Sequence, residues 1–441
     1  MNILTQLRKK KYTRSFFIAG SIAIAGLMAF RKQGPANKAP QQRHITKTGH
    51  KKNPSFLFLS DVHINTTSKT TVYGGDTGED LWAAFLHKAD TILRGKESPS
   101  FIIYTGDLPA HYSCSTGCYL PPASRTGHNN NIDTILSALH RLADKYHKPL
   151  FYLPGNNDAL AGDYYSFADE QQQTPLSLEP ASPYFFPKAM GNNNSTAAPC
   201  MVSAPHPTMG YYSACPVKGL RLVALNTVIF NANFTAVDGT TQQRDGNIQM
   251  IWLAAQLADA EAKKEKVYIA MHIPPGTDAY GGKSMWVQLP GNKTNWLNSF
   301  LNLTDRYKAT IAGILYGHTH MDEVRRLYDS TGTHITAVAI SCPGVTPQHY
   351  NNPGFKTVQY DPENMQLLDF TTYYTHPGQQ YWGDSTYSFS QAYGRLPGMT
   401  IYGRLSNMPL QNVSNGMNRI FTVKNGAATY NITSGIEVKY Q

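Results

Sequence analysis

Five short apolar segments of this chain end in side chains that bind metal ions. They read SFLFLSDVH, SFIIYTGD, LFYLPGNND, KVYIAMH and AGILYGHTH, and their polar ends hold seven such side chains: Asp61, His63, Asp107, Asn156, His272, His318 and His320. A single Asp or His after a strand is usually a cap, but five such ends in one chain are a much rarer coincidence. Seven imidazole, carboxylate and amide groups suit two divalent ions.

The segment LFYLPGNND raises a further question, because two asparagines and an aspartate follow its Pro-Gly pair. Alone it would indicate a turn, since Gly, Asn and Asp tolerate positive φ and hydrogen-bond their own backbone. Beside the other four segments, Asn156 is instead a candidate neutral ligand that limits the total charge of the site. An aspartate in such a set can bridge two ions.

The elements that must position these side chains are strands that alternate with helices. The apolar runs are typical of buried strands in an α/β sheet. Apolar residues at spacings of three and four predict helices over 132–147 and 249–262. Alternation of this kind predicts a largely parallel sheet, with the carboxyl ends of its strands along one ligand-binding edge.

Composition places the chain among packed globular proteins, with 41% hydrophobic and 15% charged residues. The net charge of +10 is uneven, because twelve of the 39 basic residues and no acidic residue lie in 1–52. The remainder therefore holds 27 basic against 29 acidic residues. A binder of nucleic acid needs basic groups clustered on its folded surface, so we expect no nucleic-acid binding.

The basic N-terminal segment has the pattern of an export signal. Five basic residues between Arg8 and Arg14 precede the apolar run SFFIAGSIAIAGLMAF. The run is shorter than the roughly 20 residues of a membrane span, which favours a cleaved signal peptide. An uncleaved anchor stays open, because no A-x-A site follows the run and Arg31 and Lys32 flank it. We expect a signal peptide or anchor over 1–32, a basic linker over 33–52, an exported body, and membrane contact only through this segment.

The five cysteines suit an exported protein. Cys114 with Cys118, and Cys200 with Cys215, are candidate local bridges, and Cys342 is then the odd, buried one. The alternative for Cys114 and Cys118 is a pair of zinc ligands, although no second pair completes a four-ligand site.

The ordered set D-x-H, G-D, G-N-x-D, H and G-H-x-H resembles the signature of the calcineurin-like metallophosphoesterases. GDLPAH, HIPPG, YGHTHMDE and NNPGFKTVQYDPE are similar to the acid sphingomyelinase-like phosphodiesterase branch. The resemblance covers 54–375 and is weaker over 381–394. It implies an α/β fold of two packed mixed β-sheets flanked by helices in four layers. A catalytic domain would span 53–375 and a small C-terminal subdomain 376–441.

The resemblance also implies a two-metal centre, commonly of zinc, with Mn or Fe as alternatives. The first ion would take Asp61, His63, Asp107 and His320, and the second Asp107, Asn156, His272 and His318. Two such ions lower the pKa of a bridging water and present hydroxide for in-line attack at phosphorus.

One position departs from the family pattern, because Asn157 stands where most members carry a histidine that protonates the leaving oxygen. An amide cannot donate that proton, so Asn157 is expected only to contact substrate. Either His111 of GDLPAH contacts substrate and acts as the acid, or the substrate has a leaving group that departs unaided.

The function that we predict is an exported phosphodiesterase, sphingomyelinase-like, acting on a phosphodiester or a nucleotide phosphoanhydride. The alternatives are a polyphosphatase or acid phosphomonoesterase on the same scaffold, and a metal-containing binding protein without turnover. We expect a monomer that binds a small phosphorylated substrate: a phospholipid head group, a nucleotide or polyphosphate. Loops 65–79, 187–213 and 277–289 would recognise its other end.

Overall fold

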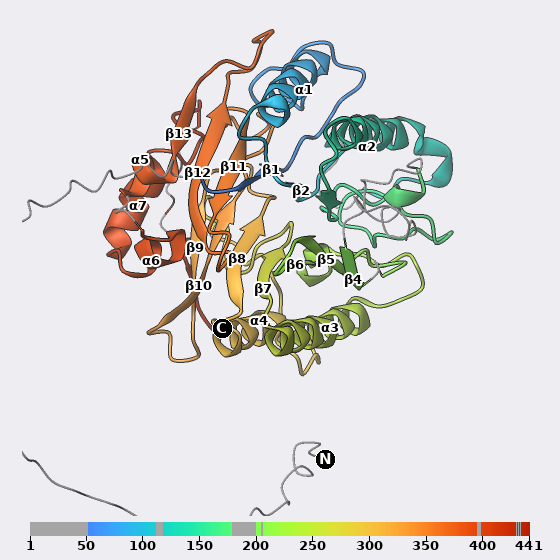
Figure 1. Cartoon of the computed structure of the whole chain (residues 1–441). Helices are drawn as coiled ribbons and strands as arrows, with labels where there is room; N and C mark the ends of the chain where they lie inside the picture. The colour runs from blue at the N-terminus through green and yellow to red at the C-terminus, as the bar shows by residue number, and fades with distance from the viewer. Residues whose placement is uncertain are drawn as a thin grey trace, which may run out of the picture. The chain divides into compact units, whose positions relative to one another are not determined.

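Two mixed β-sheets organise the chain (Figure 1). The computed structural model describes residues 52–111, 118–178, 200–203, 206–394, 398–428, 430, 432 and 434–441. Within these residues one sheet has six strands in the order β13-β12-β11-β1-β2-β3, and the other has eight in the order β14-β9-β10-β8-β7-β6-β5-β4. The predicted fold class, two mixed sheets flanked by helices, is confirmed.

The six-stranded sheet holds the first three ligand-bearing strands side by side. Its strands are β1 (Ser55–Leu59), β2 (Ile102–Tyr104), β3 (Leu150–Tyr152), β11 (Gly354–Tyr360), β12 (Leu367–Tyr374) and β13 (Thr386–Ser388). The first three are parallel, with Leu57 opposite Ile102 and Ile102 opposite Leu150. Their carboxyl ends therefore lie at one edge, while β11, β12 and β13 extend the sheet in antiparallel pairs.

The eight-stranded sheet holds the other two ligand-bearing strands. Its strands are β4 (Cys200–Ser203), β5 (Tyr212–Val217), β6 (Leu220–Ala224), β7 (Lys266–Ala270), β8 (Ile311–Tyr316), β9 (Val324–Tyr328), β10 (Ile335–Ser341) and β14 (Glu437–Val438). The strands β6, β7, β8 and β10 are parallel neighbours. The parallel ligand-bearing strands expected from the alternation are thus divided between two mixed sheets, because apolar periodicity identifies a buried strand without saying which sheet it joins.

Helices cover the outer faces of the sheets. Figure 1 shows α1 (Glu79–Arg94) and α2 (Thr126–Tyr146) beside β1 and β2, and α3 (Gln242–Lys263) and α4 (Trp296–Arg306) beside β7. The predicted helices 132–147 and 249–262 are confirmed as parts of α2 and α3, which begin earlier. The Thr241 hydroxyl accepts a hydrogen bond from the Arg244 amide and so caps α3. Short 3-10 helices occupy Pro122–Ser124, Pro175–Ser177 and Thr227–Phe230.

The C-terminal residues contribute to both sheets. Helices α5 (Phe389–Tyr393), α6 (Ile401–Ser406) and α7 (Leu410–Asn418) gather next to β12, and β13 pairs with β12. The short strand β14 pairs with β9 in the other sheet. The domain boundaries proposed from the sequence stay predictions.

Residues 1–51 lie outside the described part of the chain, and with them the predicted export signal and nearly all of the linker. Among the described residues, no helix is long and apolar enough to span a membrane.

Cys118 and Cys215 are disulfide-bonded, which removes Cys118 as a candidate zinc ligand. Cys200 lies opposite Cys215 in the β4–β5 register, Cys114 is outside the described residues, and Cys342 is free and buried as expected.

Aromatic side chains fill the space between the sheets. Phe56 of β1 lies with its ring centroid 5.8 Å from that of Tyr268 of β7, and both residues are fully buried. The Tyr268 hydroxyl donates to the Met365 carbonyl at 2.6 Å, so its polar end is also satisfied. Close packing of large rings holds the sheets at a fixed separation.

A buried ion pair joins the sheets close to the ligand-bearing loops. Lys356 of β11 donates to Asp322 at 2.6 Å and to the Ser341 carbonyl, at the end of β10, at 2.7 Å. Thr372 and Tyr387 donate to the other Asp322 oxygen, at 2.9 and 2.7 Å. Every polar atom of the pair has a partner, which a buried charge requires.

We expect Asp322→Ala to lower the free energy of unfolding by about 3–5 kcal/mol, because it leaves the Lys356 ammonium buried and unpaired. Urea and thermal unfolding would measure the loss. The matched control is Asp384→Ala, which removes a fully exposed carboxylate 2.8 Å from Lys88 and should leave the midpoint near that of the wild type. If both variants shifted the unfolding midpoint equally, burial of the Lys356–Asp322 pair would not explain the loss of stability.

Candidate metal centre

The carboxyl ends of five strands from both sheets converge on one cluster. Asp61, His63, Asp107 and His320 each place a ligand atom within 4.8 Å of those of the others, and Asp107, His272 and His318 form a second group by the same measure. Asn156 Oδ1 lies 3.0 Å from His272 Nε2, which places it in the second group. All seven side chains proposed as ligands are therefore brought together, and their division between two ions stays a prediction.

Asp107 lies between the two groups. Its Oδ2 atom is 3.2 Å from His63 Nε2 and 3.2 Å from His272 Nε2. Atoms bound to one ion at 2.0–2.2 Å in tetrahedral geometry lie about 3.5 Å apart. His320 Nε2 is 3.6 Å from Asp61 Oδ1. These separations fit ligands that share an ion, with Asp107 common to both.

Backbone carbonyls fix the orientation of two of the imidazoles. His63 Nδ1 pairs with the Pro109 carbonyl at 3.0 Å, and His272 Nδ1 with the Thr105 carbonyl at 2.7 Å. Because a carbonyl only accepts, each Nδ1 carries the hydrogen and each Nε2 offers its lone pair to the cluster. His63 Nε2 is buried without a hydrogen-bond partner among the described residues, as a metal-binding atom would be. The side chains present therefore fit a pair of metal ions.

The backbone of the cluster is strained. Five of the seven residues have left-handed φ angles: Asp61 (48°), His63 (47°), Asp107 (63°), His318 (73°) and His320 (59°). Such conformations cost on the order of 1–3 kcal/mol each and persist only where the surrounding structure enforces them. The motif glycines permit the crowding, since a Cβ on Gly155 would lie 2.2 Å from Asp107 Oδ1 and one on Gly317 2.0 Å from Ser60 Oγ.

Asp158, the last residue of GNND, joins the loops after β2 and β3. Its buried carboxylate accepts hydrogen bonds from the amides of Asp107 (3.1 Å), Leu108 (2.6 Å) and Gly155 (2.7 Å). The Tyr152 hydroxyl also donates to it, at 2.8 Å. This aspartate thus positions two ligand-bearing loops.

Asn157 donates two hydrogen bonds to the Asp107 carboxylate. Its backbone amide donates to Asp107 Oδ1 at 2.9 Å and its side-chain amide to Oδ2 at 3.1 Å. The residue is 1% exposed. Its contact with substrate stays a prediction, and the role visible in the structure is support of the shared carboxylate.

His111 lies at the more open side of the same cluster. Its ring stacks on that of His63, with centroids 3.8 Å apart and planes at 16°. A ring nitrogen lies within 4.8 Å of the nitrogens of His63 and His320, and the side chain is 28% exposed. Burial lowers the pKa of His111, but the hydrogen bond and charge of Asp76 more than offset this, so its pKa is raised.

Burial also shifts the pKa values of other groups in the cluster. It raises the pKa of Asp61 to about 7 against the attraction of His272. Burial disfavours the charged form of His272, but the negative charge of nearby Asp107 outweighs burial and raises the pKa of His272 to about 9. Burial, followed by repulsion from His272, lowers the pKa of His318 to about 3. The low pKa of His318 leaves a neutral imidazole beside buried carboxylates, and a bound cation would displace the proton that Asp107 favours on His272.

Several residues of the site carried no signal in the sequence. Asp163 accepts a hydrogen bond from Asn156 Nδ2 at 2.8 Å, which turns the Asn156 oxygen toward His272. His349 packs its ring 4.6 Å from that of His320, and Tyr280 lies 5.6 Å from His349.

Two of the three loops expected to recognise substrate therefore reach the site, since 65–79 supplies Asp76 and 277–289 supplies Tyr280. Loop 187–213 lies partly outside the described residues.

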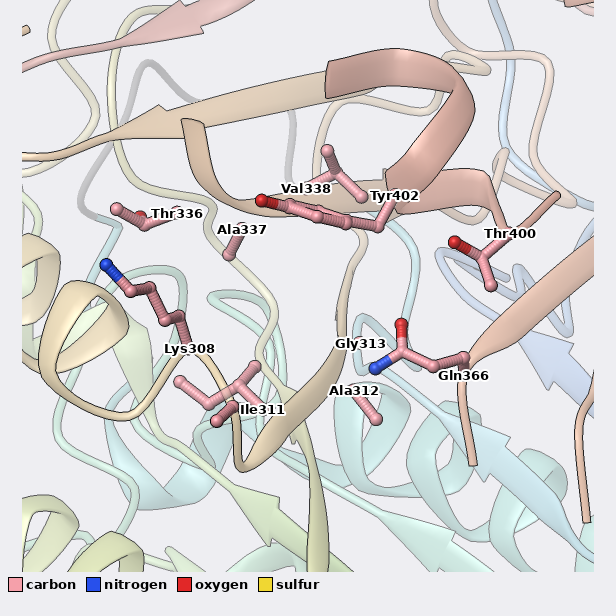
Figure 2. Close-up of a pocket in the computed structure, with 11 residues that line it drawn as sticks. Lys308, Ile311, Ala312, Gly313, Thr336, Ala337, Val338, Gln366, Thr400 and Tyr402 are labelled. Carbon is pink, nitrogen blue, oxygen red and sulfur yellow. The ribbon is translucent and has the colours of Figure 1, made fainter. Parts of the chain in front are cut away.

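A separate cavity of about 340 Å³ lies at the far ends of the strands. Figure 2 shows Lys308, Gln366 and Tyr402 around it, together with the first residues of β8. His318 and His320 follow the last residue of β8, so the cavity is about 15–20 Å from the cluster at 3.3 Å per strand residue. Its lining contains none of the proposed ligands.

Comparison with known proteins gives the following matches. The family model described as calcineurin-like phosphoesterase matches residues 54–322. A sphingomyelinase phosphodiesterase D from Dictyostelium discoideum is 26% identical over 353 residues, which cover 73% of this chain and 75% of that protein. The cyclic GMP-AMP phosphodiesterase SMPDL3A of Rattus norvegicus is 27% identical over 77% of this chain and 76% of its own length.

Solved structures also match. A dimetal phosphatase from Danio rerio matches with a TM-score of 0.45 at 14% identity, over 75% of this chain and 100% of that one.

We expect two divalent ions to copurify with the protein, and Asp107→Ala to lose both, because Asp107 is the one side chain common to the two groups. Elemental analysis by mass spectrometry would count the ions. Asp329→Ala, which removes a carboxylate from the β9–β10 hairpin, is the control and should keep both. An Asp107→Ala protein that folds and retains two ions would contradict the shared-ligand assignment.

Proposed function

The chain belongs to the calcineurin-like phosphoesterase family, and we propose that it is an exported two-metal phosphodiesterase that cleaves a small phosphorylated substrate. The family consists of metal-dependent phosphoric ester hydrolases, and the relatives described above are phosphodiesterases. One observation carries the proposal: two ligand groups share Asp107, and the partly exposed His111 lies beside them.

The proposed ligands of the first ion are Asp61, His63, Asp107 and His320, and those of the second are Asp107, Asn156, His272 and His318. When bound, two divalent ions supply a water of lowered pKa and neutralise charge on the phosphoryl oxygens. Zinc suits this imidazole-rich set, with Mn or Fe as alternatives. The rigid backbone around the ligands favours catalysis, because it holds them in place before substrate arrives.

His111 is the residue that we assign to protonation of the leaving oxygen. Its Nδ1 is bonded to Asp76, so Nε2 is the nitrogen left to face substrate. The raised pKa of His111 keeps more of the ring protonated near neutral pH than an ordinary histidine would be. Asn157 cannot perform this step, because its amide has no acidic proton and its hydrogen bonds go to Asp107.

The substrate class that we propose is a phosphodiester with an alkoxide leaving group, such as a phosphocholine lipid or a nucleotide diester. The names of the relatives, a sphingomyelinase phosphodiesterase and a cyclic GMP-AMP phosphodiesterase, support this choice. The departure of such an alkoxide needs a proton, which agrees with a histidine at the open side of the site. A panel of sphingomyelin, cyclic dinucleotide, ATP and polyphosphate tests the class.

A second candidate is hydrolysis of phosphoanhydrides, as in ATP or polyphosphate. The observation that favours it is Asn157 at the position of the usual acid, since phosphate departs without a proton. In that case Asn157→His should raise activity on alkyl phosphodiesters and change ATP hydrolysis little.

Export is proposed from the N-terminal sequence alone. Residues 1–32 would be the signal peptide or anchor, 53–375 the catalytic domain and 376–441 a small subdomain. Deletion of 1–32 should yield soluble protein of unchanged activity, because the leader contains none of the proposed ligands. Inactive or insoluble truncated protein would point to a structural role for the leader.

We expect His111→Ala to slow hydrolysis of alkyl phosphodiesters by ~10²–10⁴-fold, the usual worth of general acid catalysis. Esters that expel p-nitrophenolate should slow far less, because that leaving group departs unprotonated. Steady-state kinetics over a series of leaving groups would measure the difference, with metal content determined for each protein. Equal slowing of every ester would indicate that His111 merely supports the cluster.

A further inference from the structure

Asp76 gives both of its carboxylate oxygens to His111. Oδ1 lies 2.7 Å from the ring Nδ1, and Oδ2 accepts a hydrogen bond from the His111 backbone amide at 2.9 Å. The Asp76 side chain is 12% exposed, so little solvent competes for these bonds. One carboxylate therefore fixes both the main chain and the ring of the same residue.

The fold delivers Asp76 to this position through a three-segment pairing. Ile64, which follows the proposed ligand His63, forms parallel bridges with Thr77 on one side and with Pro109 on the other. The Thr77 amide donates to the His63 carbonyl at 3.1 Å, and the Ala110 amide to the Ile64 carbonyl at 2.9 Å. Asp76 and His111 thus come from the two outer segments and meet beside the central one.

The loop 65–79 is held in its conformation by hydrogen bonds that do not involve the Asp76 side chain. The Gly74 amide donates to the Pro347 carbonyl at 3.1 Å, and the Asn65 amide to the Thr77 carbonyl at 2.8 Å. The Thr71 hydroxyl accepts from the Gly78 amide at 2.9 Å. Because the loop is held by these bonds, the contacts of the Asp76 carboxylate point to a role at His111.

We propose that Asp76 is the positioning residue of His111. By accepting the Nδ1 hydrogen it turns Nε2 toward the site, and the stack on His63 defines the plane in which the ring is held. A third group that orients a proton donor is a common arrangement in active sites. The inference rests on the proposed function for the step that His111 performs, but the Asp76–His111 coupling is measurable whatever that step is.

A double-mutant cycle on the metal-loaded, full-length protein tests the coupling. With an alkyl phosphodiester as substrate, Asp76→Ala should lower kcat at least about 10-fold and no more than His111→Ala does, since general acid catalysis is worth about 10²–10⁴-fold. In the His111→Ala background, Asp76→Ala should have no further effect, because residues that act as one unit are not additive. Asp76→Asn, which keeps one acceptor oxygen, should recover part of the rate.

The matched control is Asp329→Ala. Asp329 is 13% exposed and lies 2.8 Å from the Nδ1 of His334, but that pair is on the β9–β10 hairpin. This variant should leave kcat unchanged. An Asp76→Ala that slows the His111→Ala protein as much as it slows the wild type would overturn the proposal, since Asp76 would then act independently of His111.

A second readout separates this proposal from the proposed function. ¹⁵N chemical shifts of the His111 ring should show hydrogen at Nδ1 in the wild type and a mixture of tautomers in Asp76→Ala. If His111→Ala leaves all rates unchanged, the acid assignment fails while an altered tautomer still supports Asp76 as the positioning residue. If the ¹⁵N shifts showed an unchanged tautomer of the His111 ring in Asp76→Ala, the positioning role would be overturned even if the rate falls.

Discussion

The carboxylate of Asp107 is the point on which the rest of the structure depends. It stands within 3.2 Å of an imidazole from each sheet, so both sheets must bring their strand ends to the same place. Asn157 donates to it twice, and Asp158 holds its backbone amide. A buried carboxylate with this many partners is held in one geometry, which a bridging ligand of two cations requires.

Such a site opposes folding unless the scaffold around it is rigid. Left-handed backbone at five of the proposed ligands and the buried Asp61 and Asp107 carboxylates all cost free energy. The packed rings between the sheets and the Lys356–Asp322 pair offset that cost and fix the distance between the sheet edges. These contacts therefore help to hold the strained backbone of the proposed ligands in place.

Under the proposed function, the asparagine at position 157 leaves the proton transfer to another part of the site. Asn157 is buried against Asp107, whereas His111 is exposed enough to meet a leaving group and is fixed by Asp76. The two residues lie on loops after different strands of the six-stranded sheet. The proposed acid therefore lies on the loop after β2, and Asn157 on the loop after β3 supports the Asp107 carboxylate instead.

The sequence by itself determined the five ligand-bearing strands, the helices within α2 and α3, and the seven side chains of the cluster. It could do so because strand burial and ligand chemistry are local properties, which spacing and residue type express directly. Only the tertiary structure decided which strand joins which of the two sheets, that Asn157 turns to Asp107, and that Asp76 and Asp163 stand behind His111 and Asn156. These contacts join residues from separate loops, and their geometry depends on how the two sheets pack, which no local pattern encodes.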